Sequence, residues 1–179
     1  VISSLALAAA PIFWSRASVT EVYTLNSFFV TSIILLILRR ALDPNMPSSR
    51  PFADKRLLAA AFLMGLGLGN HLTLVALVPP ALLLIAIKWN YKSFVTLFPV
   101  IACLGIGLLI YVYMPISASH NPAVNWGQAN EASGFWWMIS GTPYHPFAFG
   151  ASSGMWLSRL RDWSSLPVQE FSYLGAALG

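Results

Sequence analysis

The chain has 179 residues, of which 57% are apolar and only 9% are charged, and its formal net charge is +4. A soluble domain carries about 25% charged residues, so this composition excludes an ordinary soluble domain and indicates that lipid covers much of the surface. The few basic residues stand between apolar runs, which makes them markers of membrane topology. We therefore expect the lipid bilayer as a partner and no nucleic acid.

Six apolar runs are expected to enter or cross a hydrocarbon layer of about 30 Å, which predicts an all-α polytopic integral membrane protein. They are residues 1–13, 24–38, 57–70, 72–87, 93–114 and 170–179. The first and last runs are short because the sequence begins and ends inside them, so we expect an internal fragment of a longer protein. Pro115 is expected to end the fifth run, because proline does not continue a helix. Residues 115–169 are then a long loop rich in aromatic residues and glycine.

The apolar stretch 57–87 allows two interpretations. As a single helix it would be about 46 Å long, well beyond the hydrocarbon layer. Its centre carries glycines at 65, 67 and 69, followed by Asn70 and His71, which are costly at mid-bilayer unless satisfied. We favour a hairpin of two short helices that meet at Asn70-His71, and one long tilted helix remains the alternative.

Basic residues favour the cytoplasmic side of a membrane. The hairpin places seven of the ten there, and the single helix gives the same split of seven to three, so charge does not decide between them. With the hairpin, residues 14–23, Asn70-His71 and the loop 115–169 all lie on the extracytoplasmic side. We expect this to be the active face, in the plasma membrane of a bacterium.

Two polar clusters on that side could carry chemistry. In the first, Arg16 and Tyr23 share one side of a helix, and Glu21 adds a carboxylate suited to general-base work or to metal or phosphate handling. The alternative is an interfacial helix whose charges only face water. In the second, His71 could donate to a phosphate or transfer a proton beside Asn70, although a lone histidine is more often structural.

A third cluster lies in the long loop. Asn125-Trp126-Gly127 indicates a turn, and the tryptophan offers a flat face of the kind that binds sugar rings. For Trp136 and Trp137 a place in the membrane interface is the favoured interpretation. We attribute the glycines at 65, 67, 69, 105 and 107 to close helix packing, and Cys103 to a small residue in lipid or in the core.

Three stretches together resemble a known family: FWSRASVTEVYTLN at 13–26, GLGLGNHLTLVALVPP at 65–80, and YMPISASHNPAVNWGQANEASGFWWMISGTPY at 113–144. The family comprises multispanning proteins long labelled only as a domain of unknown function. It is similar to transmembrane protein O-mannosyltransferases of the GT-C class of glycosyltransferases.

The resemblance implies a GT-C-like helical membrane core, a lipid-phosphate-linked sugar donor and an active site that faces away from the cytoplasm. It also implies a catalytic base in a first extracytoplasmic loop, which would lie upstream of Val1. The matching residues are Trp14, Glu21, Tyr23, Asn70, His71, Asn125, Trp126, Gly127 and Tyr144. Ser117 departs from the pattern, since relatives often carry an arginine there. If that arginine handles the donor phosphate, either Arg16 or His120 replaces it here or the protein is impaired.

We therefore predict a membrane glycosyltransferase that moves a sugar such as mannose from a polyprenyl-phosphate donor to a protein or glycan acceptor. Its predicted catalytic residues are Glu21 and His71. The predicted substrate-binding residues are Arg16, Tyr23, Asn70, Asn125, Trp126 and Tyr144. No metal ligand is assigned, and a divalent metal cofactor stays open. The alternative is a transporter or flippase of lipid-linked sugars that uses the break at 69–71 as its substrate site.

Overall fold

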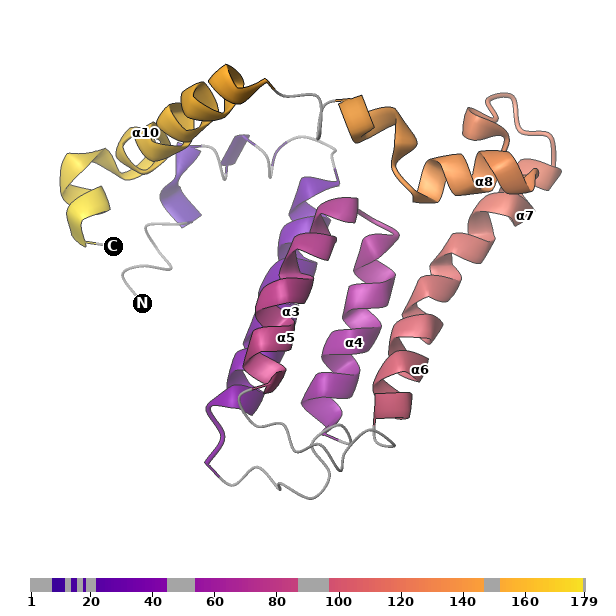
Figure 1. The fold of residues 1–179 in the computed structure, drawn as a ribbon, viewed down its shortest axis with the longest axis horizontal. Coiled ribbons are helices and arrows are strands. Elements are labelled where there is room, and N and C mark those ends of the chain that lie inside the picture. Colours follow the sequence, from indigo (N-terminus) through magenta and orange to yellow (C-terminus); the bar gives the residue numbers. More distant parts are fainter. Residues whose placement is uncertain are drawn as a thin grey trace. The chain divides into compact units, whose positions relative to one another are not determined.

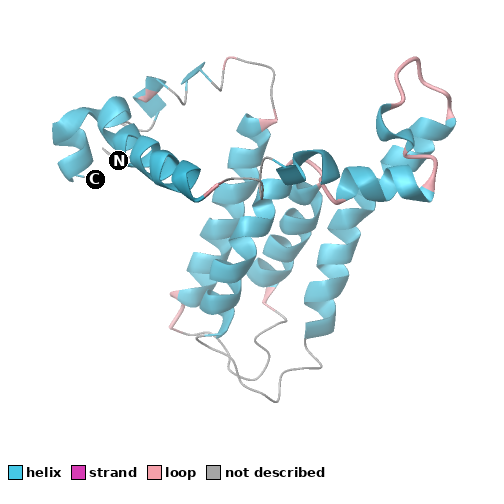
Figure 2. Cartoon of the chain, turned by 45° about the horizontal axis from the view of Figure 1, so that its top comes forward, coloured by secondary structure: helices cyan, strands magenta, loops and turns pink. Residues whose placement is uncertain are grey.

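Every regular element in the described part of the chain is helical, and Figure 2 shows no strand there. The structure, a computed structural model, describes residues 8–11, 14–15, 18, 22–44, 54–86, 97–146 and 152–178. Two compact units are distinguished, one of Val22–Ser140 and one of Val1–Glu21 with Gly141–Gly179. The all-α class predicted from the sequence is confirmed for the described residues.

The unit Val22–Ser140 holds most of the helices. In chain order they are α3 (Tyr23–Ala41), α4 (Lys55–Leu68), the 3-10 helix η1 (Leu72–Leu77), α5 (Val78–Ala86), α6 (Phe98–Leu108), η3 (Leu109–Val112), α7 (Tyr113–Ser119), η4 (Trp126–Gln128) and α8 (Ala132–Ile139). The other unit contains η5 (Thr142–Tyr144) and α10 (Ser153–Leu178).

Within the larger unit, α3 and α4 pack side by side in opposite directions, and α6 lies on the other side of α4 (Figure 1). Helix α5 returns along α3. The buried core lies where α3, α4 and η1 meet. It consists of Phe29, Ile33, Ile37, Ala60, Met64 and Leu74.

Two glycines let α4 and α6 approach closely. A Cβ atom added to Gly65 would collide with the backbone carbonyl of Leu104, and one added to Gly107 would collide with that of Phe62. Packing by small residues, as predicted, is therefore confirmed at these two positions. It is wrong for Gly105 within the part of the chain that the structure describes, because its added Cβ would meet nothing there within 4 Å.

The chain between 57 and 87 breaks in its middle. Helix α4 ends at Leu68, and η1 begins at Leu72 and continues into α5. Gly69 and Asn70 turn the chain, so that α5 runs back beside α3 (Figure 1). This is the break that the hairpin interpretation requires. Whether each half enters a bilayer stays a prediction.

The sequence predicted that Pro115 ends a helix, and the structure differs. The helical run passes from α6 through η3 into α7 and ends at Ser119. Pro115 is the third residue of α7, and first-turn positions tolerate proline because their N–H groups have no partner within the helix. The 3-10 helix η3 changes to the α-helix α7 at Tyr113, so Pro115 lies in a first turn although the helical run continues.

The predicted loop 115–169 also contains regular structure. Helix α10 begins at Ser153 and contains Pro167. Trp156, Leu160 and Trp163 recur at helical spacing and are exposed. This amphipathic period, which the prediction of a loop overlooked, explains why a helix forms here.

Two helical runs in the described residues are long and apolar enough to cross a membrane. They are Tyr23–Ala41 and Phe98–Ser119, and Leu72–Leu84 is a shorter apolar run. Several large apolar side chains of the second run, such as Ile106 and Leu109, are more than half exposed. The six-span arrangement stays a prediction.

Candidate functional site

The break between α4 and η1 forms a compact polar corner. The backbone N–H groups of Asn70 and His71 both donate to the carbonyl of Gly67, at 2.9 Å each, and so close the end of α4. His71 has an extended backbone and acts as the N-cap of η1. The corner thus exposes two polar side chains at a place where the helical hydrogen bonds have ended.

Asn70 fastens this corner to the start of α3. Its side-chain Nδ2 donates to the backbone carbonyl of Val22 at 3.0 Å, across 48 residues of sequence. Tyr23, the next residue, begins α3. The structure therefore brings together Tyr23 and Asn70, two residues predicted for one site from separate motifs.

His71 lies against Tyr23 and Thr73. The ring centroids of His71 and Tyr23 are 5.6 Å apart, with the planes tilted by 39°. On the other side of the imidazole, Nδ1 lies 2.8 Å from the hydroxyl of Thr73 and accepts the backbone N–H of the same residue at 3.3 Å. Tyr23 is exposed and His71 is half-buried, so the rings form part of a surface that a ligand could reach.

The 3-10 helix η3, which follows α6, supports this corner through two side chains. The hydroxyl of Tyr111 donates to the carbonyl of Leu68 at 2.7 Å, which satisfies one of the last carbonyls of α4. An added Cβ on Gly69 would collide with the side chain of Ile110. The corner is therefore held by α3 on one side and by η3 on the other.

Thr73 belongs to the polar stretch 69–73 of the sequence but was assigned no role there, and Tyr111 was not singled out. Thr73 stands two residues after His71 at the start of an apolar run, and a polar residue before such a run is typical of an N-cap whose acceptor bonds the second helical N–H. That pattern could have identified the His71–Thr73 pair. Nothing in the apolar run around Tyr111 indicates its contact, which depends on how α6 packs against α4.

The Asn125-Trp126-Gly127 motif forms the turn that the sequence predicted. Gly127 has φ +70°, a conformation that favours glycine, and a Cβ there would press on Met138. Asn125 Nδ2 donates to Asn130 Oδ1 at 3.2 Å. The Trp126 ring, 68% exposed, lies 6.4 Å from that of Trp137 between centroids. The turn presents an aromatic surface next to α8.

The structure does not join this turn to the corner. Among the described residues, no hydrogen bond or ring contact links Asn125 or Trp126 with Asn70 or His71. Tyr144 lies in η5 of the other unit and is 67% exposed. Arg16 and Glu21 lie outside the described residues, so their predicted roles stay predictions.

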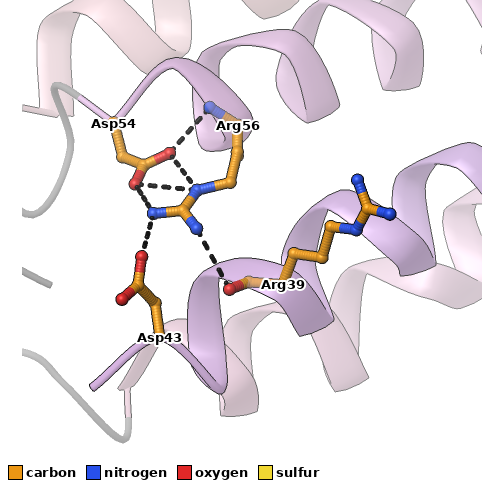
Figure 3. Close-up of polar contacts among 4 residues, drawn as sticks. All are labelled: Arg39, Asp43, Asp54 and Arg56. Atoms are coloured by element: carbon orange, nitrogen blue, oxygen red, sulfur yellow. Dashed lines mark hydrogen bonds and ion pairs between the residues drawn. The ribbon is translucent and has the colours of Figure 1, made fainter. Parts of the chain in front are cut away.

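A cluster of charged residues lies at the ends of α3 and α4 that are farther from the corner. Arg56 Nη2 lies 2.9 Å from Asp43 Oδ2 and 2.7 Å from Asp54 Oδ2, and its Nη1 donates to the carbonyl of Arg39 at 3.1 Å (Figure 3). The side-chain hydrogen bonds from Arg56 hold the pKa of the Asp54 carboxyl below its usual range. This Arg56 cluster ties the end of α3 to the start of α4, far along both helices from His71.

Within the described ranges, no group of three or more His, Cys, Asp or Glu side chains could hold a metal ion. His120, a predicted substitute for the missing arginine, has Nδ1 2.7 Å from the carbonyl of Ile116 in its own helix. Cys103 is a half-buried free thiol. None of these residues adds a second polar centre to the corner.

Comparison with protein families matches residues 1–95 to the N-terminal domain of the protein O-mannosyl-transferase TMEM260. The match covers more than half of the 179 residues. The chain belongs to this family. Its family name supports a transferase of the glycosyltransferase type. Comparisons with curated proteins and with solved structures gave no match.

The matched range separates the predicted site residues into two groups. Tyr23, Asn70 and His71 lie inside it, as do Arg16 and Glu21. Beyond it lie Asn125, Trp126 and Tyr144. The three side chains of the corner, Tyr23, Asn70 and His71, thus lie within the range matched to the N-terminal domain of this family.

Proposed function

We propose that this chain forms part of a GT-C membrane enzyme that transfers mannose from a polyprenyl-phosphate donor to a protein or glycan acceptor outside the cytoplasm. The observation that carries the proposal is the corner of Tyr23, Asn70 and His71, which lies within the range matched to an O-mannosyltransferase domain. The corner combines hydrogen-bonding groups with an exposed aromatic ring. Such a surface suits a sugar joined to a phosphate.

The reaction requires three tasks of the site. The acceptor hydroxyl oxygen forms a bond to C1 of mannose while the bond from C1 to the phosphate oxygen breaks. The hydroxyl proton passes to a base, and the polyprenyl phosphate leaves with the bonding electron pair. We assign the base to a carboxylate, which the family resemblance places upstream of Val1 and for which Glu21 is the candidate within this chain. We assign contacts with the leaving phosphate to Arg16 and His71.

Asn70 has a different task from the one expected of a substrate-binding residue. One of the two N–H groups of its amide donates to the carbonyl of Val22. Asn70 therefore acts as a positioning residue that holds the start of α3, and with it Tyr23, next to His71. Its Oδ1 remains a second polar atom in the corner.

The distribution of charge supports an extracytoplasmic site. Arg39, Arg40, Lys55 and Arg56 all lie where α3 ends and α4 begins, whereas the corner lies at the other ends of these helices. Because basic residues mark the cytoplasmic side, this arrangement favours a corner that faces away from the cytoplasm. The two apolar helical runs, Tyr23–Ala41 and Phe98–Ser119, support a location in the membrane.

The test is mannose transfer by the full-length protein in detergent, with polyprenyl-phosphate mannose as donor. Alanine at both Glu21 and His71 is expected to lower kcat/KM by at least about 100-fold. Ser164→Ala is the matched control, because in the described part of the chain its hydroxyl donates to the carbonyl of Arg161, within α10. Detergent removes the sealed compartments that a flippase needs, so product formation separates the two functions. Unchanged transfer in the double variant would contradict the assignment.

A further inference from the structure

We propose that Thr73 fixes the neutral His71 ring in the tautomer with its proton on Nε2. His71 would then donate a hydrogen bond to a phosphate oxygen of the sugar donor and would not act as the base that deprotonates the acceptor. The role of His71 rests on the proposed function, whereas the tautomer follows from the geometry of the corner alone.

The backbone of Thr73 decides the tautomer. Its N–H lies 3.3 Å from His71 Nδ1 and points at it with hydrogen-bonding geometry. An amide N–H can only donate, so Nδ1 must be the acceptor and carries no proton. In a neutral imidazole the single proton then sits on Nε2.

The side chain of Thr73 strengthens the same choice. Its hydroxyl oxygen lies 2.8 Å from Nδ1, and a hydroxyl can donate as well as accept. Because the neighbouring amide already requires Nδ1 to accept, the hydroxyl also donates to it. Two donors from one residue thus converge on Nδ1, as at an N-cap whose side chain accepts the second helical N–H.

The other ring nitrogen is available to a ligand. In the part of the chain that the structure describes, Nε2 of His71 has no hydrogen-bond partner. The Nε2 atom is also not among the fully buried side-chain atoms that lack a hydrogen-bond partner. The ring of Tyr23 lies against the imidazole and limits its rotation. A fixed ring with an unused N–H is suited to donate to an oxygen that gains negative charge.

This assignment divides the chemistry between two residues. As the bond from C1 to the phosphate oxygen breaks, negative charge grows on the phosphate, and the Nε2–H of His71 stabilises it. The acceptor proton cannot pass to a nitrogen that already holds one, so it goes to a carboxylate such as Glu21. Thr73 is a positioning residue, because it acts only through His71.

The tautomer can be measured without any activity. The full-length protein is labelled with ¹⁵N-histidine, and the His71 signals are identified by their loss in His71→Asn. We expect an Nε2 shift typical of a protonated nitrogen and an Nδ1 shift typical of an unprotonated one. Thr73→Val removes only the hydroxyl and should raise the fraction with the proton on Nδ1, whereas Thr73→Ser should not. A dominant Nδ1–H form in the wild type would overturn the proposal.

Two substitutions of His71 separate the roles of its nitrogens. Asparagine keeps an acceptor near the Nδ1 position, where it caps η1, and lacks the distal donor. Glutamine can place an N–H₂ group near the Nε2 position and cannot take up a proton. We expect an about 100-fold loss of transfer in His71→Asn and a loss of about 10-fold or less in His71→Gln. Equal losses would indicate proton transfer by His71 and overturn the proposal. If the wild type transferred no mannose, the proposed function would fail while the tautomer result stood.

Discussion

Asn70 shows how one side chain can decide the shape of the corner. Its hydrogen bond to the Val22 carbonyl is the contact that holds the break after α4 to the start of α3. The Val22 carbonyl also accepts the backbone N–H of Asn26 at 2.9 Å, so the Asn70 amide is its second donor. A substitution of Asn70 therefore measures how much this contact contributes to stability.

Asn70→Ala is expected to lower the free energy of unfolding by about 1 kcal/mol, because the Val22 carbonyl loses a neutral donor at a partly exposed place. Thermal unfolding in detergent, followed by tryptophan fluorescence, measures the change. Gln169→Ala is the control, since among the described residues its amide donates to the hydroxyl of Ser165 in the same helix, α10. Equal melting temperatures for Asn70→Ala and the wild type would show that the contact does not hold the corner.

Asp54 predicts a dependence of stability on pH. Its pKa is lowered in the folded protein, chiefly by the side-chain hydrogen bonds from Arg56. A lowered pKa means that folding favours the carboxylate. The stabilisation is therefore present above the unfolded pKa of about 3.9 and is lost as the pH falls through the lower folded pKa.

Two variants test this. Asp54→Asn keeps an acceptor for the Arg56 backbone N–H and removes the charge, so the loss of stability between pH 7 and about pH 3 should shrink. Asp54→Ala also removes the cap, which should cost about 1 kcal/mol more at both pH values. Unfolding curves at the two pH values provide the comparison. A pH dependence that Asp54→Asn leaves intact would assign the effect to other carboxylates.

At the scale of elements, the contact between α4 and α6 depends on Gly65 and Gly107. Their missing side chains let the helix backbones approach, and backbone atoms cannot move aside as a side chain can. Since α6 leads to Tyr111, which braces the end of α4, this contact also supports the corner.

Gly65→Ala is expected to destabilise the protein by about 1–3 kcal/mol, because the new methyl group meets the Leu104 carbonyl. Gly105→Ala should instead be neutral or stabilising by up to about 1 kcal/mol, since its Cβ meets nothing and alanine favours a helix. Thermal unfolding of both variants tests the pair. A larger loss of stability in Gly105→Ala than in Gly65→Ala would mean that the face of α6 that contacts α4 is assigned wrongly.

The sequence predicts these elements better than it predicts their contacts. The break at 69–71 follows from glycines and polar residues inside an apolar stretch, and the turn at Gly127 follows from its motif. The end at Pro115 was predicted wrongly, because the rule that proline breaks helices does not apply in a first turn that follows a 3-10 segment. Local residues also cannot show that Asn70 reaches Val22, 48 positions away, since that contact depends on the packing of α3 on α4.

For the larger unit as a whole, we predict a membrane orientation. Pro44 follows α3 at the end where the Arg56 cluster lies, and Ala123 follows α7 beyond the corner end; both are exposed. If α3 and the run 98–119 cross the bilayer, these two positions lie on opposite sides.

Single cysteines placed at these positions in a Cys103→Ser background test the orientation. A membrane-impermeant maleimide applied to intact cells should label Ala123→Cys and should label Pro44→Cys only after permeabilisation. Labelling of both cysteines in intact cells would contradict a spanning arrangement. Labelling of Pro44→Cys alone would place the corner in the cytoplasm.

The central claim is that the corner of Tyr23, Asn70 and His71 binds the lipid-phosphate-linked sugar, and photo-crosslinking tests it most directly. A polyprenyl-phosphate mannose with a diazirine next to the phosphate is irradiated with the full-length protein, and the modified peptides are identified by mass spectrometry. We predict adducts at residues 21–23 or 70–73 that unlabelled donor suppresses. Suppressible adducts confined to the Arg56 cluster, or none in either range, would contradict the account.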